Sequence, residues 1–329
     1  MIDPRPVAAR PARYNLPQMR RCFLAFVAGI VVVAGAVSAP RAQSTAATPC
    51  NVTTTERVVA IGDVHGAHDQ FVAILRAAGL IDARARWSGG RAVFVQTGDI
   101  LDRGTDSRKV IDLLRRLERE ARSAGGRVIA LMGNHEFMRL AGDWRYVSPG
   151  EYKAFRDGES MRQAFAAGAT YGDWMRARPA VARVNGVVFL HGGISDEAAS
   201  LGCEAINETV MKETKALPGD PALVPSLFSS GEKGPLWYRG LAQEPESAFA
   251  PTLGSILNRM GARAIVVGHT PTPGRMATRF GGRVVQIDTG MLGGAFFPGG
   301  VPSALLIEGH EMTAIYLDRR EPLGSIPTS

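Results

Sequence analysis

Cysteine is scarce in this chain, whose 329 residues include only Cys22, Cys50 and Cys203. The sequence also lacks any collagen-like, coiled-coil or internal repeat pattern, which excludes fibrous and repeat architectures. Apolar residues make up 45% of the chain and charged residues 21%, and this composition excludes global disorder. The length is sufficient for one large α/β domain or two smaller ones.

The chain has no surplus of acidic residues, and its formal charge is +7. Most of that charge lies at the N-terminus, because residues 1–42 contain six Arg and one Asp. The remaining residues carry 32 Lys and Arg against 30 Asp and Glu. No basic stripe is present there, so we expect no nucleic-acid partner.

The N-terminal segment has the pattern of a bacterial secretory signal. Arg20 and Arg21 precede an uncharged apolar run at 22–39, and small residues follow it. We expect residues 1–42 to be removed and the protein to be periplasmic or secreted. The alternative is an uncleaved membrane anchor, since 18 apolar residues are just long enough to span a bilayer. Cleavage leaves Cys50 and Cys203, which could form a disulfide or remain two buried thiols.

A linker at 43–56 is followed by short runs rich in Val and Ile, which are typical of strands. These runs lie at 58–61, 92–95, 127–132, 187–190, 264–267, 284–287, 304–307 and 312–317. Helical patterns at 69–80 and 107–124 separate the first three, and a β-α-β-α-β order predicts parallel strands. Asn185-Gly186 predicts a hairpin, and the closing strands at 284–317 are expected to be antiparallel. The sequence therefore predicts an α/β fold with two mixed sheets between helices.

Polar residues follow five of these strands, at the strand ends where ligands bind in α/β sheets. The five motifs are Gly62-Asp63-Val64-His65-Gly66, Gly98-Asp99-Ile100-Leu101-Asp102-Arg103-Gly104, Gly133-Asn134-His135-Glu136, His191-Gly192-Gly193 and Gly268-His269-Thr270. Four of the six histidines lie in them. A single histidine at a strand end is usually structural, but four beside glycines, together with Asp63, Asp99 and Asn134, indicate a metal site.

The candidate ligands combine histidine nitrogen with carboxylate and amide oxygen and include no thiolate. This set suits Mn²⁺, Fe or Zn²⁺ and argues against a cysteine-type structural zinc site. Seven candidates exceed what one ion needs, and two metal ions about 3.5–4 Å apart are a recurring device for phosphoryl chemistry. Asp99 is the natural bridge between them, and Arg103 could grip a phosphate.

In their order and spacing these motifs resemble those of the calcineurin-like metallophosphoesterases. They are most similar to the phosphoprotein phosphatase branch, in which the second motif has the form GDxxDRG. The stretches at 131–143 and 234–240 most resemble the bacterial Shewanella-like phosphatases. The resemblance implies a four-layer αββα sandwich over residues 57–320, with helical cap segments near 136–178 and 195–262. Residues 321–329 are expected to form a flexible tail.

The resemblance also implies roles. Asp63, His65 and Asp99 would hold one metal ion, and Asp99, Asn134, His191 and His269 the other. A hydroxide shared by the two ions would attack phosphorus in line, and His135, oriented by Asp102, would protonate the leaving oxygen. Arg103 and Arg239 would bind the phosphate oxygens. For Arg239, packing on Trp237 is the alternative.

The sequence departs from this branch near the C-terminus, where residues 287–292 replace a Ser-Ala-Pro-Asn-Tyr-Cys segment of the eukaryotic enzymes. Asp288 in this stretch could support a ligand histidine or cap a turn, and we expect His68 to be a solvated helix residue. The function expected is a two-metal phosphomonoesterase acting on a phosphorylated protein, including phosphotyrosine, or on a small molecule. The alternatives are a dinucleoside-polyphosphate hydrolase, a phosphodiesterase and a non-enzymatic metal-dependent binding protein.

Overall fold

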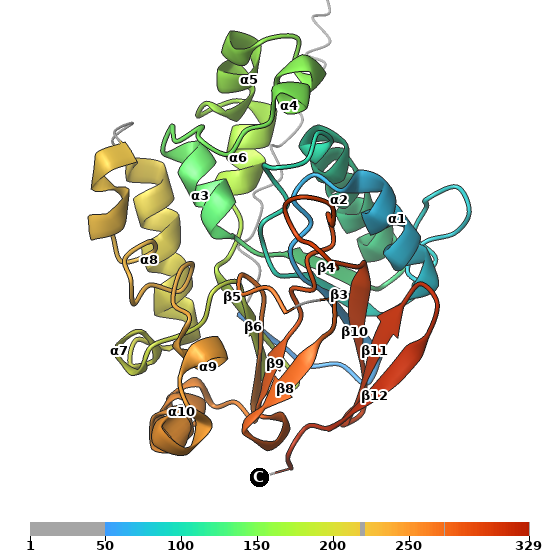
Figure 1. Ribbon diagram of the computed structural model, residues 1–329, viewed down its shortest axis with the longest axis vertical. Coiled ribbons are helices and arrows are strands. Elements are labelled where there is room, and N and C mark those ends of the chain that lie inside the picture. Colours follow the sequence, from blue (N-terminus) through green and yellow to red (C-terminus); the bar gives the residue numbers. More distant parts are fainter. Residues whose placement is uncertain (1–49, 218–220, 273, 329) are drawn as a thin grey trace, which may run out of the picture. The chain divides into compact units, whose positions relative to one another are not determined.

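The computed structural model describes residues 50–217, 221–272 and 274–328, and within them the chain forms two six-stranded mixed sheets (Figure 1). The expected leader at 1–42 lies outside the described residues. In strand order, the first sheet comprises β12 (Arg320–Ser325), β11 (Glu311–Tyr316), β10 (Ser303–Glu308), β2 (Val58–Ile61), β3 (Val93–Gln96) and β4 (Arg127–Ala130). The second comprises β1 (Asn51–Val52), β5 (Val181–Val184), β6 (Val187–Leu190), β7 (Ala264–Val267), β9 (Val284–Gln286) and β8 (Ala277–Arg279).

Strand alternation explains why the two sheets pack face to face. On β2, Val58 and Ala60 belong to the apolar core between the sheets, whereas Val59 and Ile61 point to the helical side. Strand β6 alternates in the same way, with Phe189 inside and Val188 outside. Strands buried on both faces read as continuous apolar runs, which is the pattern that the sequence shows.

Helices cover the outer face of each sheet and complete the expected four-layer αββα sandwich. Helices α1 (His68–Ala77) and α2 (Ser107–Ser123) pack on the first sheet, and α7 (Asp196–Ala199), α8 (Gly202–Ala216) and α10 (Glu246–Met260) on the second (Figure 1). A helical segment, residues 134–176, contains α3 (Asn134–Leu140), α4 (Pro149–Ala154), α5 (Gly158–Phe165) and α6 (Thr170–Arg176). The short α9 (Gly240–Gln243) precedes α10.

Two expectations about the end of the chain are wrong. The expected tail at 321–329 is largely ordered, because Arg320–Ser325 pairs with β11 as an edge strand. Strand β9 does not pair with the later closing strands: it lies in the second sheet, parallel to β7 and antiparallel to β8, while β10 and β11 form the expected antiparallel hairpin. The parallel order of β2, β3 and β4 and the hairpin at Asn185-Gly186 are confirmed.

Cys50 and Cys203 form a disulfide, which joins the residue before β1 to α8. Of the two arrangements that the sequence left open, the structure has the disulfide. Among the described residues, no helix combines the length and the apolar character that crossing a bilayer requires.

Candidate two-metal active site

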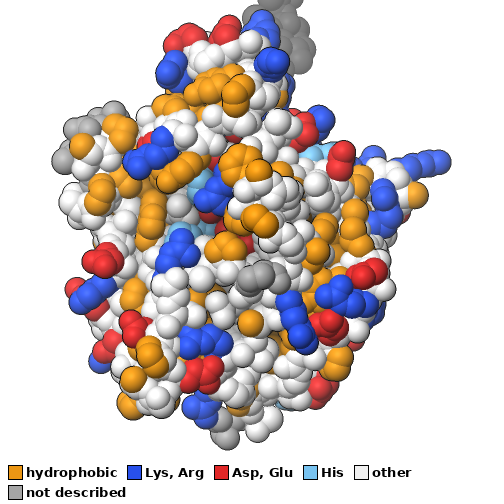
Figure 2. Space-filling model, viewed as in Figure 1, with side chains coloured by type: hydrophobic (Ala, Val, Ile, Leu, Met, Phe, Trp, Pro, Cys, Tyr) orange, Lys and Arg blue, Asp and Glu red, His pale blue; other side chains and the backbone are white. Residues whose placement is uncertain are grey.

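The loops that follow β2, β3 and β4 meet the loops that follow β6 and β7 at one edge of the sandwich. A cavity of about 460 Å³ opens there, and histidine and arginine side chains are visible inside the hollow (Figure 2). A hydrogen bond joins the two sheets at this edge, because the backbone N–H of His269 donates to the Asp63 carboxylate at 3.0 Å. The site is thus built from both sheets.

Backbone strain is concentrated in these loops. Five residues that are not glycine have a positive φ here: His65, Asp99, Asp102, Arg103 and His269. Such conformations cost about 1–3 kcal/mol each and persist only where the surroundings hold them. At Gly98, where φ is +96°, a Cβ would lie 2.6 Å from the backbone of Gly133, so the close approach of these two loops requires glycine.

One cluster of candidate ligands gathers around the imidazole of His191. Its Nε2 lies 2.7 Å from Asn134 Oδ1, 3.1 Å from His269 Nδ1 and 3.3 Å from Asp99 Oδ1. The cluster contains the four residues expected to hold the second metal ion, and all four are buried. The ligand atoms of Asp99, His191 and His269 all lie within 4.8 Å of one another, close enough to bind one cation.

A second cluster lies on the other side of Asp99. His65 Nε2 is 3.7 Å from Asp99 Oδ2 and 3.8 Å from Asp63 Oδ2. The two oxygens of Asp99 therefore face different clusters, Oδ1 toward His191 and Oδ2 toward His65. This is the arrangement that a carboxylate bridging two cations requires.

The histidines of both clusters present a lone pair to the site. The Nδ1–H of His65 donates to Leu101 O at 2.8 Å, and that of His191 donates to Thr97 O at 3.0 Å, which leaves each Nε2 as an acceptor. Burial lowers the pKa of His65 to about 3 and the pKa of His269 to about 2. These imidazoles are neutral at pH 7, as metal ligands must be.

His135 differs from these histidines, although its side chain also lies near His65 and Asp99. Its Nδ1 bonds the carboxylate of Asp102 at 2.7 Å, and its Nε2 lies 3.8 Å from Asp99 Oδ2. Burial opposes the charged form, but the carboxylates of Asp99 and Asp102 prevail and raise the pKa of His135. With Nδ1 bonded to Asp102, this histidine is oriented as a proton donor would be.

The buried carboxylates at this edge fit divalent cations. Burial raises the pKa of Asp63 well above its ordinary range, and the neighbouring charges of Asp288 and Asp99 raise it further. Cations held by the two clusters would compensate these like charges. When bound, they would polarise a phosphoryl oxygen and lower the pKa of a water molecule.

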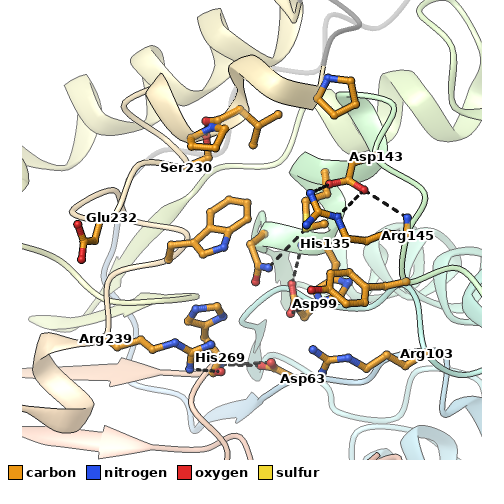
Figure 3. Close-up of a pocket in the computed structure, with 17 residues that line it drawn as sticks. Asp63, Asp99, Arg103, His135, Asp143, Arg145, Ser230, Glu232, Arg239 and His269 are labelled. Atoms are coloured by element: carbon orange, nitrogen blue, oxygen red, sulfur yellow. Dashed lines mark hydrogen bonds and ion pairs between the residues drawn. The ribbon is translucent and has the colours of Figure 1, made fainter.

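Arg103 and Arg239 approach the clusters from opposite sides, with Asp63 and His269 between them (Figure 3). Arg239 Nη1 donates to His269 O and Thr270 Oγ1, each at 2.9 Å. The described residues include no ring contact between Arg239 and Trp237. Arg103 Nη1 donates to His65 Nε2 at 2.7 Å, so a cation binding that lone pair would free this guanidinium for phosphate.

Asp288 and His68 are the two remaining residues that the sequence analysis discussed. Asp288 Oδ1 accepts from the backbone N–H of Gly290 at 2.9 Å, which caps a turn, and its charge acts on Asp63. Burial raises the pKa of Asp288 to about 6. The structure thus shows the turn cap, which was one of the two roles expected for Asp288. His68 begins α1 and bonds the exposed Asp69.

Glu136 is a site residue to which the sequence analysis gave no role. Its buried carboxylate accepts four backbone N–H bonds, from Gly133, Asp99, Ile100 and Leu101, at 2.7–3.2 Å. A glutamate three residues after the start of a helix is a capping-box pattern, which could have indicated this residue. Its contacts with 99–101 could not have been found in that way.

The family model for calcineurin-like phosphoesterases matches residues 56–273. The chain belongs to this family. An uncharacterized protein of Schizosaccharomyces pombe is 34% identical over 248 residues, which are 71% of this chain and 73% of that one. Shewanella-like protein phosphatase 2 of Arabidopsis thaliana is 30% identical over 297 residues, which are 77% of this chain and 75% of that one.

A solved structure of similar fold is the cold-active protein-tyrosine phosphatase of a psychrophilic Shewanella species. Its TM-score is 0.73 at 30% identity, and the match covers 84% of this chain and 82% of that one. The chain is a metal-binding phosphoester hydrolase with Shewanella-like phosphatase relatives. These findings do not favour a dinucleoside-polyphosphate hydrolase or a non-enzymatic binding protein.

Proposed function

We propose that this phosphoesterase removes phosphate from tyrosine side chains of proteins, using two divalent cations. Asp63, His65 and Asp99 would hold one cation, and Asp99, Asn134, His191 and His269 the other. Arg103 and Arg239 would bind the phosphate dianion, since two guanidinium groups fit a monoester better than a singly charged diester. His135 would donate a proton to the leaving oxygen.

The observation that carries the tyrosine preference is the wall of the cavity beyond the two clusters. Apolar and aromatic side chains line it on several sides: Met138, Tyr146, Val224, Pro225 and Trp237. Burial of an aromatic leaving group against such a wall is favourable, whereas a serine side chain has little apolar surface to bury there. The tyrosine phosphatase named among the similar structures supports the same substrate class.

The donor set also limits the identity of the metals. Neutral imidazoles with carboxylate and amide oxygens suit Mn²⁺, Fe and Zn²⁺, and we propose that the two ions come from this group. Metal analysis of protein purified from its native host tests the proposal, and a content of Mg²⁺ or Ca²⁺ alone would contradict it.

We further propose that the enzyme works in the periplasm or outside the cell. The basic and apolar pattern of residues 1–42 supports export, and so does the disulfide between Cys50 and Cys203, because disulfides persist in oxidising compartments. Mature protein from the native host is expected to begin near Gln43. An N-terminal sequence that still contains residues 23–37 would favour the membrane anchor.

The function is tested with two peptides of one sequence, one phosphorylated on tyrosine and the other on serine at the same position. We expect kcat/KM for the phosphotyrosine peptide to be roughly 10-fold to 100-fold higher, the range that one apolar contact surface supplies. The substitution Trp237→Ala is expected to reduce this ratio, and Phe296→Ala, on an exposed side chain outside the cavity wall, to leave it unchanged. Equal rates for the two peptides, or hydrolysis of diadenosine tetraphosphate alone, would contradict the proposal.

A further inference from the structure

Arg139 of α3 is a completely buried arginine, with 1% of its surface exposed. Its guanidinium lies 4.9 Å from the ring centre of Trp144 and 4.9 Å from that of Phe165. A buried guanidinium is costly to desolvate unless it is paired. Its Nη2 donates to Asp102 Oδ1 and also lies 3.4 Å from Glu151 Oε1, so two carboxylates compensate the charge.

Asp102 is shared between this arginine and the candidate general acid. Oδ1 accepts from Arg139, while Oδ2 accepts from His135 Nδ1 at 2.7 Å. Asp102 itself has a positive φ of 68°, a strained backbone conformation that persists only where its surroundings hold it. The contacts form a continuous series from His135 through Asp102 and Arg139 to Glu151 of α4. The series links the catalytic loop to the helical segment 134–176.

The contacts of Arg139 suit a role in orienting Asp102 better than a role in stabilising the fold. A buried ion pair is often replaceable by apolar side chains of similar volume at no cost in stability, so stability alone gives little reason for a charged residue here. A planar guanidinium that contacts two aromatic rings and is completely buried has little freedom to rotate. The direction in which Nη2–H points is therefore fixed, and it determines where Asp102 can lie.

We propose that Arg139 is a positioning residue, which acts through Asp102 to hold the imidazole of His135 in the orientation that protonates the leaving group. This inference rests on the function proposed above. As the bond between phosphorus and the leaving oxygen breaks, its electron pair goes to that oxygen, which takes the proton from His135 Nε2. The imidazole keeps its Nδ1 proton, and Asp102 remains a carboxylate bonded to Arg139.

Arg178, just after the helical segment 134–176, provides a matched control for Arg139. Arg178 is also largely buried, pairs with Glu118 and lies 4.4 Å from the ring centre of Trp174. Arg178 does not line the cavity, and its hydrogen bonds go to Glu118 and to Trp174 O. Arg178→Met therefore removes a comparable buried ion pair and ring contact without touching Asp102.

The kinetic experiment compares Arg139→Met, Arg139→Lys and Arg178→Met in the full chain, loaded with Mn²⁺. The substrates are aryl phosphates of decreasing leaving-group acidity and one alkyl phosphate. We expect Arg139→Met to lower kcat for the alkyl phosphate by roughly 10-fold to 100-fold, within the range of general acid catalysis, with little change for 4-nitrophenyl phosphate and in KM. Arg139→Lys is expected to be intermediate, because it keeps the charge without the planar fork.

A spectroscopic readout needs neither metal nor turnover. The His135 Nδ1 proton, bonded to a carboxylate, should give a low-field proton resonance that is absent in His135→Asn. We expect this resonance to be lost or shifted upfield in Arg139→Met and unchanged in Arg178→Met. If Arg139→Met does not fold, Arg139→Lys and Glu151→Gln provide the same comparison.

Two results would overturn the inference. One is an equal loss of kcat for all leaving groups in Arg139→Met. The other is an unchanged His135 resonance in Arg139→Met. A wild-type protein that hydrolyses none of the phosphomonoesters would contradict the proposed function instead, and the resonance would still decide whether Arg139 orients His135.

Discussion

The carboxylate of Glu136 accepts a hydrogen bond from the backbone N–H of Asp99 at 2.7 Å, although the two residues are 37 positions apart. The same oxygen accepts from the N–H of Gly133 at 2.8 Å. One buried side chain thus joins the loop that carries Asp99 to the loop that carries Asn134 and His135. The spacing of both candidate metal clusters depends on this connection.

We therefore expect Glu136→Ala to reduce both metal content and stability. The substitution leaves four backbone N–H groups without their acceptor, and each unsatisfied buried group costs about 1–3 kcal/mol. Thermal unfolding and metal analysis measure the two effects. Glu213→Ala is the control, because Glu213 also accepts backbone N–H bonds, from Phe228 and Ser229, and none of these three residues belongs to either cluster. It should lower stability while both ions stay bound, and metal loss in the control would contradict the role of Glu136.

Asp99→Asn is expected to lower the content of both metal ions and the turnover together. The amide has one oxygen, so it cannot offer one to each cluster, and it removes a negative charge from between them. Inductively coupled plasma mass spectrometry and phosphatase assays check this. Asp143→Asn, which alters a cavity-lining acid paired with Arg145, should keep both ions. Full activity of Asp99→Asn with two ions bound would exclude the bridging role.

Removal of the candidate general acid, His135, should slow hydrolysis most for substrates with a poor leaving group. His135→Asn is expected to slow an alkyl phosphate about 10²–10⁴-fold, the usual contribution of a general acid, and an activated aryl phosphate much less. Asp102→Asn should give a smaller effect of the same kind, because it disturbs the orientation without deleting the donor. Steady-state kinetics on both substrates measure the difference. Metal loss in His135→Asn would mean that this histidine is a ligand.

The disulfide should stabilise the fold without contributing to turnover. Cys50 and Cys203 are 153 positions apart, and closing so long a loop typically contributes about 2–5 kcal/mol. Neither residue lines the cavity. Replacing both by serine is expected to lower the free energy of unfolding in urea by that amount and to leave kcat unchanged at 25 °C. An unchanged unfolding midpoint would show that the crosslink constrains the unfolded chain little.

The sequence was sufficient to predict the central strands and the residues that follow them. Strands β2, β6 and β7 match the expected ranges. Short continuous runs of Val and Ile between glycine-containing loops are typical of buried strands and too short for most helices. The clustering of Asp63, Asp99 and Asn134 could be expected since neighbouring parallel strands end at one edge. The motifs at the strand ends also placed His191 and His269 among the candidate ligands, whereas the division of the ligands between two ions came from the family resemblance.

Features that depend on distant contacts were not predictable. Strand β12 contains Pro322 and Gly324, which weaken any strand pattern in the sequence. It forms by pairing with the edge of β11, and the register of this pairing shifts between Met312 and Thr313. Arg139 appears as an ordinary helix residue in the sequence. Its partners, Asp102 on one side and Glu151 on the other, come together only in the folded chain.

The division of the site between two sheets also fixes the order in which it can be completed during synthesis. Asp63, His65 and Asp99 all emerge with the first sheet's early strands, so a nascent chain ending after β4 already has every donor of the His65 cluster. The His191 cluster must wait for β6 and then for β7, whose last residue is followed at once by Gly268 and His269. A ribosome-bound fragment that stops before β7 would lack only His269 among the six expected ligands, and acquisition of the second cation would report that β7 has joined the second sheet.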